Sequence, residues 1–226
     1  MRPIQEIGSG NAVALAAAAA ALGLPPASFG IVPATWNRSG SVVPELELEV
    51  WSTGALSVTA AVLYGGRLHP FVYADQTITG SAAANTLTKS AHGLLTGDGP
   101  FDLTNAGGAL PGGLSPSVPI WAIKVDANTF KAALSLSDAL AGVFIDLTTD
   151  GTGTSTIHDR ADTQRVYWET HDGLLGLAGD GAFDLTASAG YSKRVPHSPR
   201  VVAYALVGTL STGTVSAAIY PIQDRD

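Results

Sequence analysis

The stretch GDGPFDLT, residues Gly97–Thr104, joins a tight turn to the start of a strand and decides the fold of the surrounding sequence. Asp followed by Gly is a common turn pair, because Asp tolerates a positive φ and glycine adopts one with little strain. After the turn, Phe101 and Leu103 alternate with polar residues, and this period of two predicts a strand with one buried face. A near copy, GDGAFDLT, occupies Gly179–Thr186 and predicts the same local structure.

The aspartates of the two copies also allow a second interpretation, a calcium site. Calcium binds six to eight oxygens, and the spacing D-G-x-x-D supplies two carboxylates together with nearby carbonyls. The carboxylates would be those of Asp98 and Asp102 in the first copy, and of Asp180 and Asp184 in the second. Neither copy has the denser D-x-D-x-D-G pattern of a dedicated calcium loop, so we favour the turn and expect no metal or cofactor.

Two similar segments lie near opposite ends of the chain. Each consists of a strand, an STG turn and a second strand that ends close to a tyrosine. The segments are PELELEVW-STG-ALSVTAAVLYGG (Pro44–Gly66) and RVVAYALVG-TLSTG-TVSAAIYPI (Arg200–Ile222). We expect two β-hairpins that pair or face each other in a single β-sandwich.

The middle of the chain has a different composition, rich in Thr, Gly, Ala, Asn and Asp, with frequent turn signals such as AGGALPGG and TDGTGT. One helical turn is expected in SLSDALAG, with Ser135 or Ser137 as its cap. The predicted strands are NTLTKSA (Asn85–Ala91), PFDLTNA (Pro100–Ala106), VPIWAIKVD (Val118–Asp126), TFKAAL (Thr129–Leu134) and GVFIDLTT (Gly142–Thr149).

Several blocks of this middle region resemble a small β module that recurs in virion proteins of tailed bacteriophages. The blocks are KSAHGLLTGDGP, GALPGGL, WAIKVDANTFKAALSLSDALAG and IDLTTDGTGTSTI, in the same order and with similar spacing. They cover roughly a third of the chain, from Thr77 to Ile157. The resemblance implies a phage virion structural protein. It leaves the position in the virion open, because the module occurs within many different host proteins.

Composition narrows the possible partners. The net charge is −7 and the few Lys and Arg residues are scattered, which argues against nucleic-acid binding. Hydrophobic residues make up 46% of the chain and charged residues only 14%, so we expect much of the surface to contact other protein, including copies of itself. The absence of cysteine excludes disulfides, thiol nucleophiles and cysteine-based metal sites.

The apolar stretch AVALAAAAAALGL, Ala12–Leu24, is too short to span a bilayer. One interpretation is the core of a signal peptide, but the preceding residues include Glu6 and supply only Arg2 as a basic side chain. We favour a short Ala-rich helix in an N-terminal arm, ended by Pro25 and Pro26, that packs against a neighbouring subunit.

No linear motif for catalysis is present. The histidines form no zinc-binding pattern, and there is neither a nucleophile elbow nor a phosphate loop. His92 is interpreted as part of a structural turn, and the polar run His158–Asp162 as a solvated linker. A glycosidase pair such as Glu169 with Asp172 or Asp184 depends on spatial separation, and nothing in the sequence favours it. We therefore predict that the protein is not an enzyme.

Together these observations predict an all-β fold in which a β-sandwich host domain carries an inserted, barrel-like β module. The expected parts are an N-terminal arm (1–28), a discontinuous host domain (29–76 and 158–226) and the inserted module (77–157). The predicted function is that of a virion structural protein, assembled in the bacterial cytoplasm and serving as a capsid decoration protein that contacts the major capsid protein. The alternatives are a tail, neck or baseplate component, or a carbohydrate-binding adhesin. No nucleic acid or membrane partner is expected.

Overall fold

The computed structural model describes residues 5–10, 28–33, 45–53, 60–170, 182–184, 190–196, 201–208 and 214–222. Within these ranges the regular structure is almost entirely β, with one short helix, which confirms the predicted all-β class. The strands are β1 (Gln5–Gly10), β2 (Ser28–Pro33), β3 (Glu45–Thr53), β4 (Ala60–Pro70), β5 (Gln76–Ser81), β6 (Thr86–Thr88), β7 (Asp102–Ala106), β8 (Trp121–Lys124), β9 (Thr129–Ala133), β10 (Thr154–His158), β11 (Gln164–Thr170), β12 (Ala182–Asp184), β13 (Gly190–Pro196), β14 (Ala203–Gly208) and β15 (Thr214–Ile222), and the helix is α2 (Leu136–Ala141).

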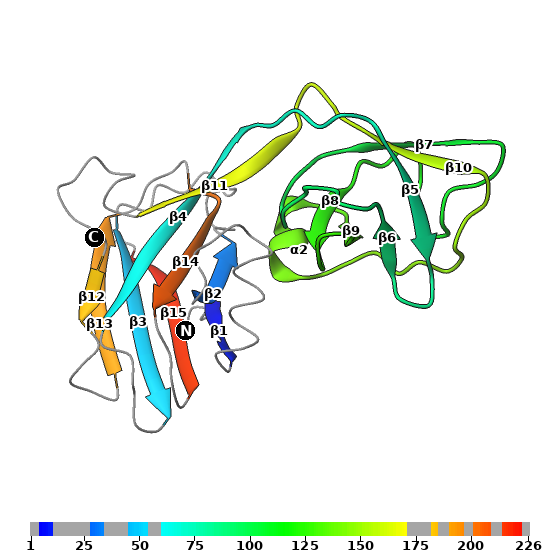
Figure 1. The fold of residues 1–226 in the computed structure, drawn as a ribbon. Helices are drawn as coiled ribbons and strands as arrows, with labels where there is room; N and C mark the ends of the chain where they lie inside the picture. Colours follow the sequence, from blue (N-terminus) through cyan, green and yellow to red (C-terminus); the bar gives the residue numbers. More distant parts are fainter. Residues whose placement is uncertain are drawn as a thin grey trace. The chain divides into compact units, whose positions relative to one another are not determined.

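The chain divides into two compact units. The central unit comprises residues 68–166, and the flanking unit comprises residues 1–67 together with 167–226. Figure 1 shows β5 to β10 and α2, which lie in the central unit, in green to yellow-green. Among the described residues, no helix combines the length and the apolar character needed to cross a membrane.

The flanking unit contains two antiparallel sheets. One has the strand order β1-β15-β3-β13, and the other has the order β11-β4-β14-β2, with β12 added alongside β4. The two similar segments of the sequence pair with each other, as predicted: β3 pairs with β15 along its whole length, and β4 pairs with β14. The hairpin form is wrong, however, because β3 and β4 lie in different sheets, as do β14 and β15.

The length of the connections permits this arrangement. Six residues separate the end of β3 from the start of β4, and five separate β14 from β15. Tight hairpins favour loops of two residues, whereas these connections are long enough for the chain to cross from one sheet to the other. Each strand then finds its ladder partner in the other copy of the segment.

The beginning of the chain also differs from the predicted N-terminal arm of residues 1–28. Residues 5–10 form β1, which pairs with β15 at the edge of the four-stranded sheet, so this part of the arm belongs to the fold. At the edge of the sheet, the backbone N–H and C=O groups on one side of β1 bond to β15. In a free arm these groups would bond to water instead. The Ala-rich segment Ala12–Leu24 lies outside the described residues.

The six strands of the central unit form a ring. Their order is β7-β10-β5-β6-β9-β8, every neighbouring pair being antiparallel. The first and last strands of this order are joined as well, because Phe101 and Ile120 exchange both backbone hydrogen bonds, with N···O distances of 2.8 and 3.0 Å. The ring therefore closes at the GDGPF turn, immediately before β7 and β8 begin.

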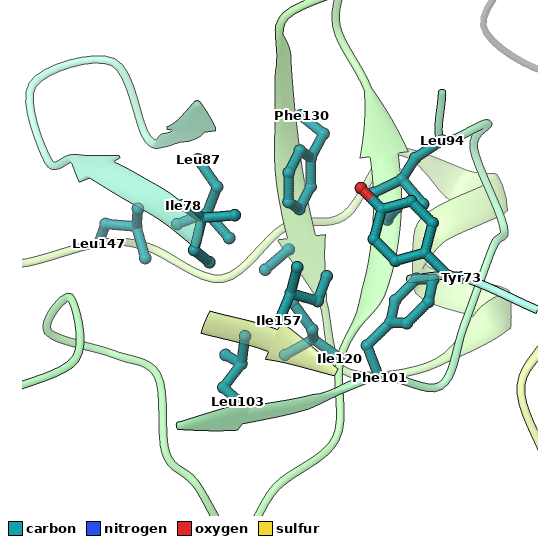
Figure 2. Packing of buried hydrophobic residues seen from close by; sticks show 12 residues of the cluster. Tyr73, Ile78, Leu87, Leu94, Phe101, Leu103, Ile120, Phe130, Leu147 and Ile157 are labelled. Atoms are coloured by element: carbon teal, nitrogen blue, oxygen red, sulfur yellow. The ribbon is translucent and has the colours of Figure 1, made fainter. Parts of the chain in front are cut away.

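The inside of the ring is filled by one apolar cluster. Phe101 and Leu103 point inward and are almost fully buried, which confirms the alternation predicted for GDGPFDLT. In Figure 2 the rings of Tyr73 and Phe101 lie next to each other at one end of the cluster, with their centroids 5.3 Å apart. Leu147, Ile78 and Leu87 gather at the other end.

Four of the five strands predicted in the middle of the chain are present, as β6, β7, β8 and β9. The predicted helical turn is α2; the Ser135 side chain caps it and Gly142 ends it in the left-handed conformation. The fifth strand, GVFIDLTT, does not form. Within it, the Leu147 N–H donates to the Asn85 side chain rather than to a neighbouring strand.

Two glycine-rich loops of the ring pack backbone against backbone. Ala109 and Thr152 exchange N–H···O bonds of 3.2 and 2.8 Å, and Gly112 bonds to the loop at Thr148 and Thr149. The loops approach so closely that a Cβ atom added to Gly108 would lie 2.3 Å from the Thr152 carbonyl oxygen. The turn signals AGGALPGG and TDGTGT therefore specify a joint between two loops that are distant in the sequence.

Gly108→Ala tests this joint, with Gly107→Ala as its matched control. Gly107 has φ +74° but nothing lies within 4 Å of its added Cβ, so this substitution should cost about 1–2 kcal/mol of backbone strain. Gly108→Ala should cost about 3 kcal/mol, because the atom it meets is backbone and cannot turn aside. Urea unfolding measures the loss of unfolding free energy in each variant. Equal losses in the two variants would contradict the close approach of the loops.

Candidate functional site: the aspartates of the GDGPFD turn

The turn that closes the ring is hydrogen-bonded on both sides. Gly97 donates to the Ala122 carbonyl at 2.9 Å and Ala122 donates to the Asp98 carbonyl at 2.8 Å, while Gly99 exchanges two bonds with Gln164. Gly97 and Gly99 have positive φ values, of 94° and 144°, whereas Asp98 does not. The turn is therefore present as predicted, but the role expected for Asp98 in it was wrong, because the glycines supply the unusual conformations.

Asp98 is instead the centre of a buried ion pair. Its carboxylate is fully buried and accepts hydrogen bonds from Arg165 Nε at 2.8 Å, from Arg165 Nη2 at 2.5 Å and from the Leu95 N–H at 2.8 Å. The Arg165 guanidinium also donates to the Gly93 carbonyl and lies 3.8 Å from the centroid of the Phe71 ring. Two charge-assisted bonds from one guanidinium satisfy a carboxylate that has lost its hydration.

Burial dominates the electrostatics of this pair. Loss of hydration raises the pKa of Asp98, and the hydrogen bonds and positive charge of Arg165 oppose that rise. The pKa of Tyr73 is also raised, first by burial and then by the negative charge of Asp98. The pair is therefore a structural anchor held in a low-dielectric environment.

Asp102 has a different environment on the outer face of the ring. Its carboxylate binds Arg160 Nη1 at 2.7 Å, and Arg160 Nε binds Asp162 at 2.9 Å. The hydrogen bonds from Arg160 lower the pKa of Asp162. The run His158–Asp162, expected to be a solvated linker, is thus tied into the ring. That interpretation was wrong because its charged residues find partners on β7 and in the following turn.

The contacts of Asp98 and Asp102 bear on the calcium interpretation of the first copy. Both carboxylates of the first copy bind arginine, a cation that occupies the oxygens calcium would need. Within the described part of the chain, no group of three or more His, Asp or Glu side chains could hold a metal ion. In the second copy Asp184 ends β12, which pairs with β4, and Asp180 lies outside the described residues.

His92 is a buried structural residue, as expected. Its Nδ1 accepts a hydrogen bond from the Leu94 N–H at 3.0 Å, so the proton of the neutral ring is on Nε2, which donates to the Asp126 carbonyl at 3.0 Å. The ring also lies edge-on against Phe130, with centroids 5.3 Å apart. His92 thereby joins the AHG turn to the hairpin of β8 and β9.

Among the described contacts, one group of side chains has the geometry of a catalytic relay, and His158 is at its centre. Its Nε2 lies 2.6 Å from Thr104 Oγ1, and its Nδ1 lies 2.9 Å from Asp75 Oδ2. Sequence reasoning missed the group, because Asp75, Thr104 and His158 lie far apart along the chain and form no linear motif. Strand register was the only signal that could have found it.

Of the glycosidase candidates, Glu169 is exposed on β11 and Asp172 lies outside the described residues.

No protein-family model, curated protein or solved structure matches the chain.

The Asp98–Arg165 pair can be tested with a double-mutant cycle. Arg165→Met leaves a buried carboxylate without its cation and should lower the free energy of unfolding by about 3–5 kcal/mol. Adding Asp98→Asn should restore much of this loss, because a neutral amide replaces the unpaired charge. Arg160→Met is the control: its pair with Asp102 is only partly buried, with side chains 33% and 44% exposed, so the loss should be clearly smaller. Additive losses in the cycle would contradict direct coupling.

Proposed function

We propose that the protein is a structural protein of a tailed-bacteriophage virion and, within it, a capsid decoration protein on the head surface. The observation that carries the proposal is the resemblance of the blocks between Thr77 and Ile157 to the phage module. In support, two of these blocks contain residues that take part in buried contacts of the ring. The AHGLLTGDGP block contains the buried Asp98 and ends immediately before Phe101, which closes the ring. The VDANTF block contains the turn between β8 and β9, where the Asp126 carbonyl binds His92.

The architecture that we propose is a β-sandwich host domain carrying the central unit as an inserted module. Two observations support it. The flanking unit has two antiparallel sheets, and each strand-STG-strand segment contributes one strand to each sheet. The central unit is one continuous stretch, residues 68–166, between the two sequence pieces of the flanking unit. Stacking the two sheets would bury the apolar face of both.

A decoration role requires surfaces that bind neighbouring subunits, which we propose to be copies of the chain and the major capsid protein. Apolar side chains are exposed beside α2 and β9: Leu134 is 58% exposed, Val143 57% and Phe144 40%. Such side chains on a protein with few charges are suited to burial against another protein surface. The acidic net charge of −7 supports protein rather than nucleic-acid partners.

Cryo-electron microscopy of purified phage particles that contain this chain tests the proposal. Density on the capsid shell that fits the central unit is the expected result. Density in the tail or baseplate would contradict the capsid decoration role, but the protein would still be a virion structural protein. Particles that lack the chain by mass spectrometry would overturn the virion assignment itself.

Separate expression of residues 68–166 tests the inserted module. The two ends of this stretch are joined, since the Phe71 N–H donates to the Thr163 carbonyl at 3.0 Å, so the excised unit should fold and melt cooperatively. The shorter fragment 77–157 lacks both Phe71 and Arg165 and leaves Asp98 buried without its cation, so it should not fold. Circular dichroism distinguishes the two. Cooperative melting of the shorter fragment would show that the ring does not need its ends.

A further inference from the structure

The outer face of β5, β10 and β7 carries a connected set of polar side chains. The register pairs Thr156 of β10 with Thr104 of β7 on one side and with Thr77 of β5 on the other. His158 pairs with Asp102, and continuing the β10–β5 register by one residue places Asp75 opposite His158. Three separate parts of the chain therefore bring a hydroxyl, an imidazole and a carboxylate to one place.

The order of the hydrogen bonds fixes the direction of proton transfer. His158 Nδ1 lies 2.9 Å from a carboxylate oxygen of Asp75, which can only accept, so the proton of the neutral ring is on Nδ1. Nε2 is then the acceptor for the Thr104 hydroxyl, at 2.6 Å. This is the relationship of nucleophile, base and orienting acid that activates hydroxyl groups in acyl transfer.

We propose that Thr104, His158 and Asp75 form a hydrolytic site for small acyl esters. Thr104 is exposed on the sheet face, where an acyl group carried on a polymer or another surface can reach it. Arg160 binds Asp102, which precedes Thr104 by two residues on β7, so a guanidinium also lies on this face of the sheet. This activity would be additional to the proposed architectural role and does not depend on it.

The reaction consumes one ester and one water molecule and yields one alcohol and one carboxylic acid. Thr104 Oγ1 attacks the ester carbonyl carbon while His158 Nε2 takes the hydroxyl proton. The bond to the alcohol breaks, the alcohol leaves with that proton, and an acyl-threonine remains. Water then attacks the acyl carbon, again losing a proton to His158. The carboxylic acid leaves as Thr104 Oγ1 recovers the proton.

The test uses the full chain with p-nitrophenyl acetate at mildly alkaline pH. Wild-type protein should release p-nitrophenolate in a burst followed by slower turnover, and peptide mass spectrometry of the quenched reaction should find the acetyl group on Thr104. Thr104→Val and His158→Gln should each slow acyl transfer by about 100-fold or more. Asp75→Asn should have a smaller effect, and Thr104→Ser should retain the burst because it keeps the hydroxyl.

Two controls separate this site from ordinary surface reactivity. Thr77→Val removes an exposed hydroxyl from the same face, and His69→Gln removes an exposed imidazole; both should react like the wild type. Thermal melting followed by circular dichroism should show that every variant is folded. The proposal is overturned if folded Thr104→Val reacts as fast as the wild type, if the acetyl group is found only on lysine or histidine, or if acetyl-Thr104 forms but is never hydrolysed.

Discussion

The central unit depends on one buried charge. The Asp98 carboxylate has no access to water, and an unpaired charge in that position would cost more than a typical protein can lose. Its partner, Arg165, lies in β11 near the end of the unit and packs on Phe71, which lies near the beginning of the unit. Asp98 can therefore be buried only when both ends of the stretch have come together.

The same turn also fixes the ring and its core. Residues on either side of Asp98 make the backbone bonds that join the ends of the strand order, and Phe101, three residues later, enters the core beside Tyr73. Ring closure, core packing and charge pairing are thus properties of one short segment. The repeated GDG-FDLT pattern is explained in its first copy by this local geometry, with both aspartates held by arginine.

Features specified by neighbouring residues could be predicted from the sequence. The alternation of Phe101 and Leu103 indicated the buried face of a strand, and Ser135 indicated the start of a helical turn. The partners of individual polar and charged side chains could not be predicted, because these partners lie far along the chain. Asp98 meets Arg165 across 67 positions and Thr104 meets His158 across 54. For the same reason local turn signals suggested hairpins where the strands instead pair between the two ends of the chain.

The pairing of β3 with β15 has a consequence for biosynthesis. While the chain is being made on a ribosome, β3 emerges long before its ladder partner β15, because the whole central unit lies between them in the sequence. The residues that contact one another in the ring all lie within the continuous stretch 68–166. This stretch can therefore fold while later parts of the chain are still being synthesised. The sheet that contains β3 cannot form fully until β15 has been synthesised. Until then the apolar side chains of β3 stay available to chaperones and to neighbouring nascent chains.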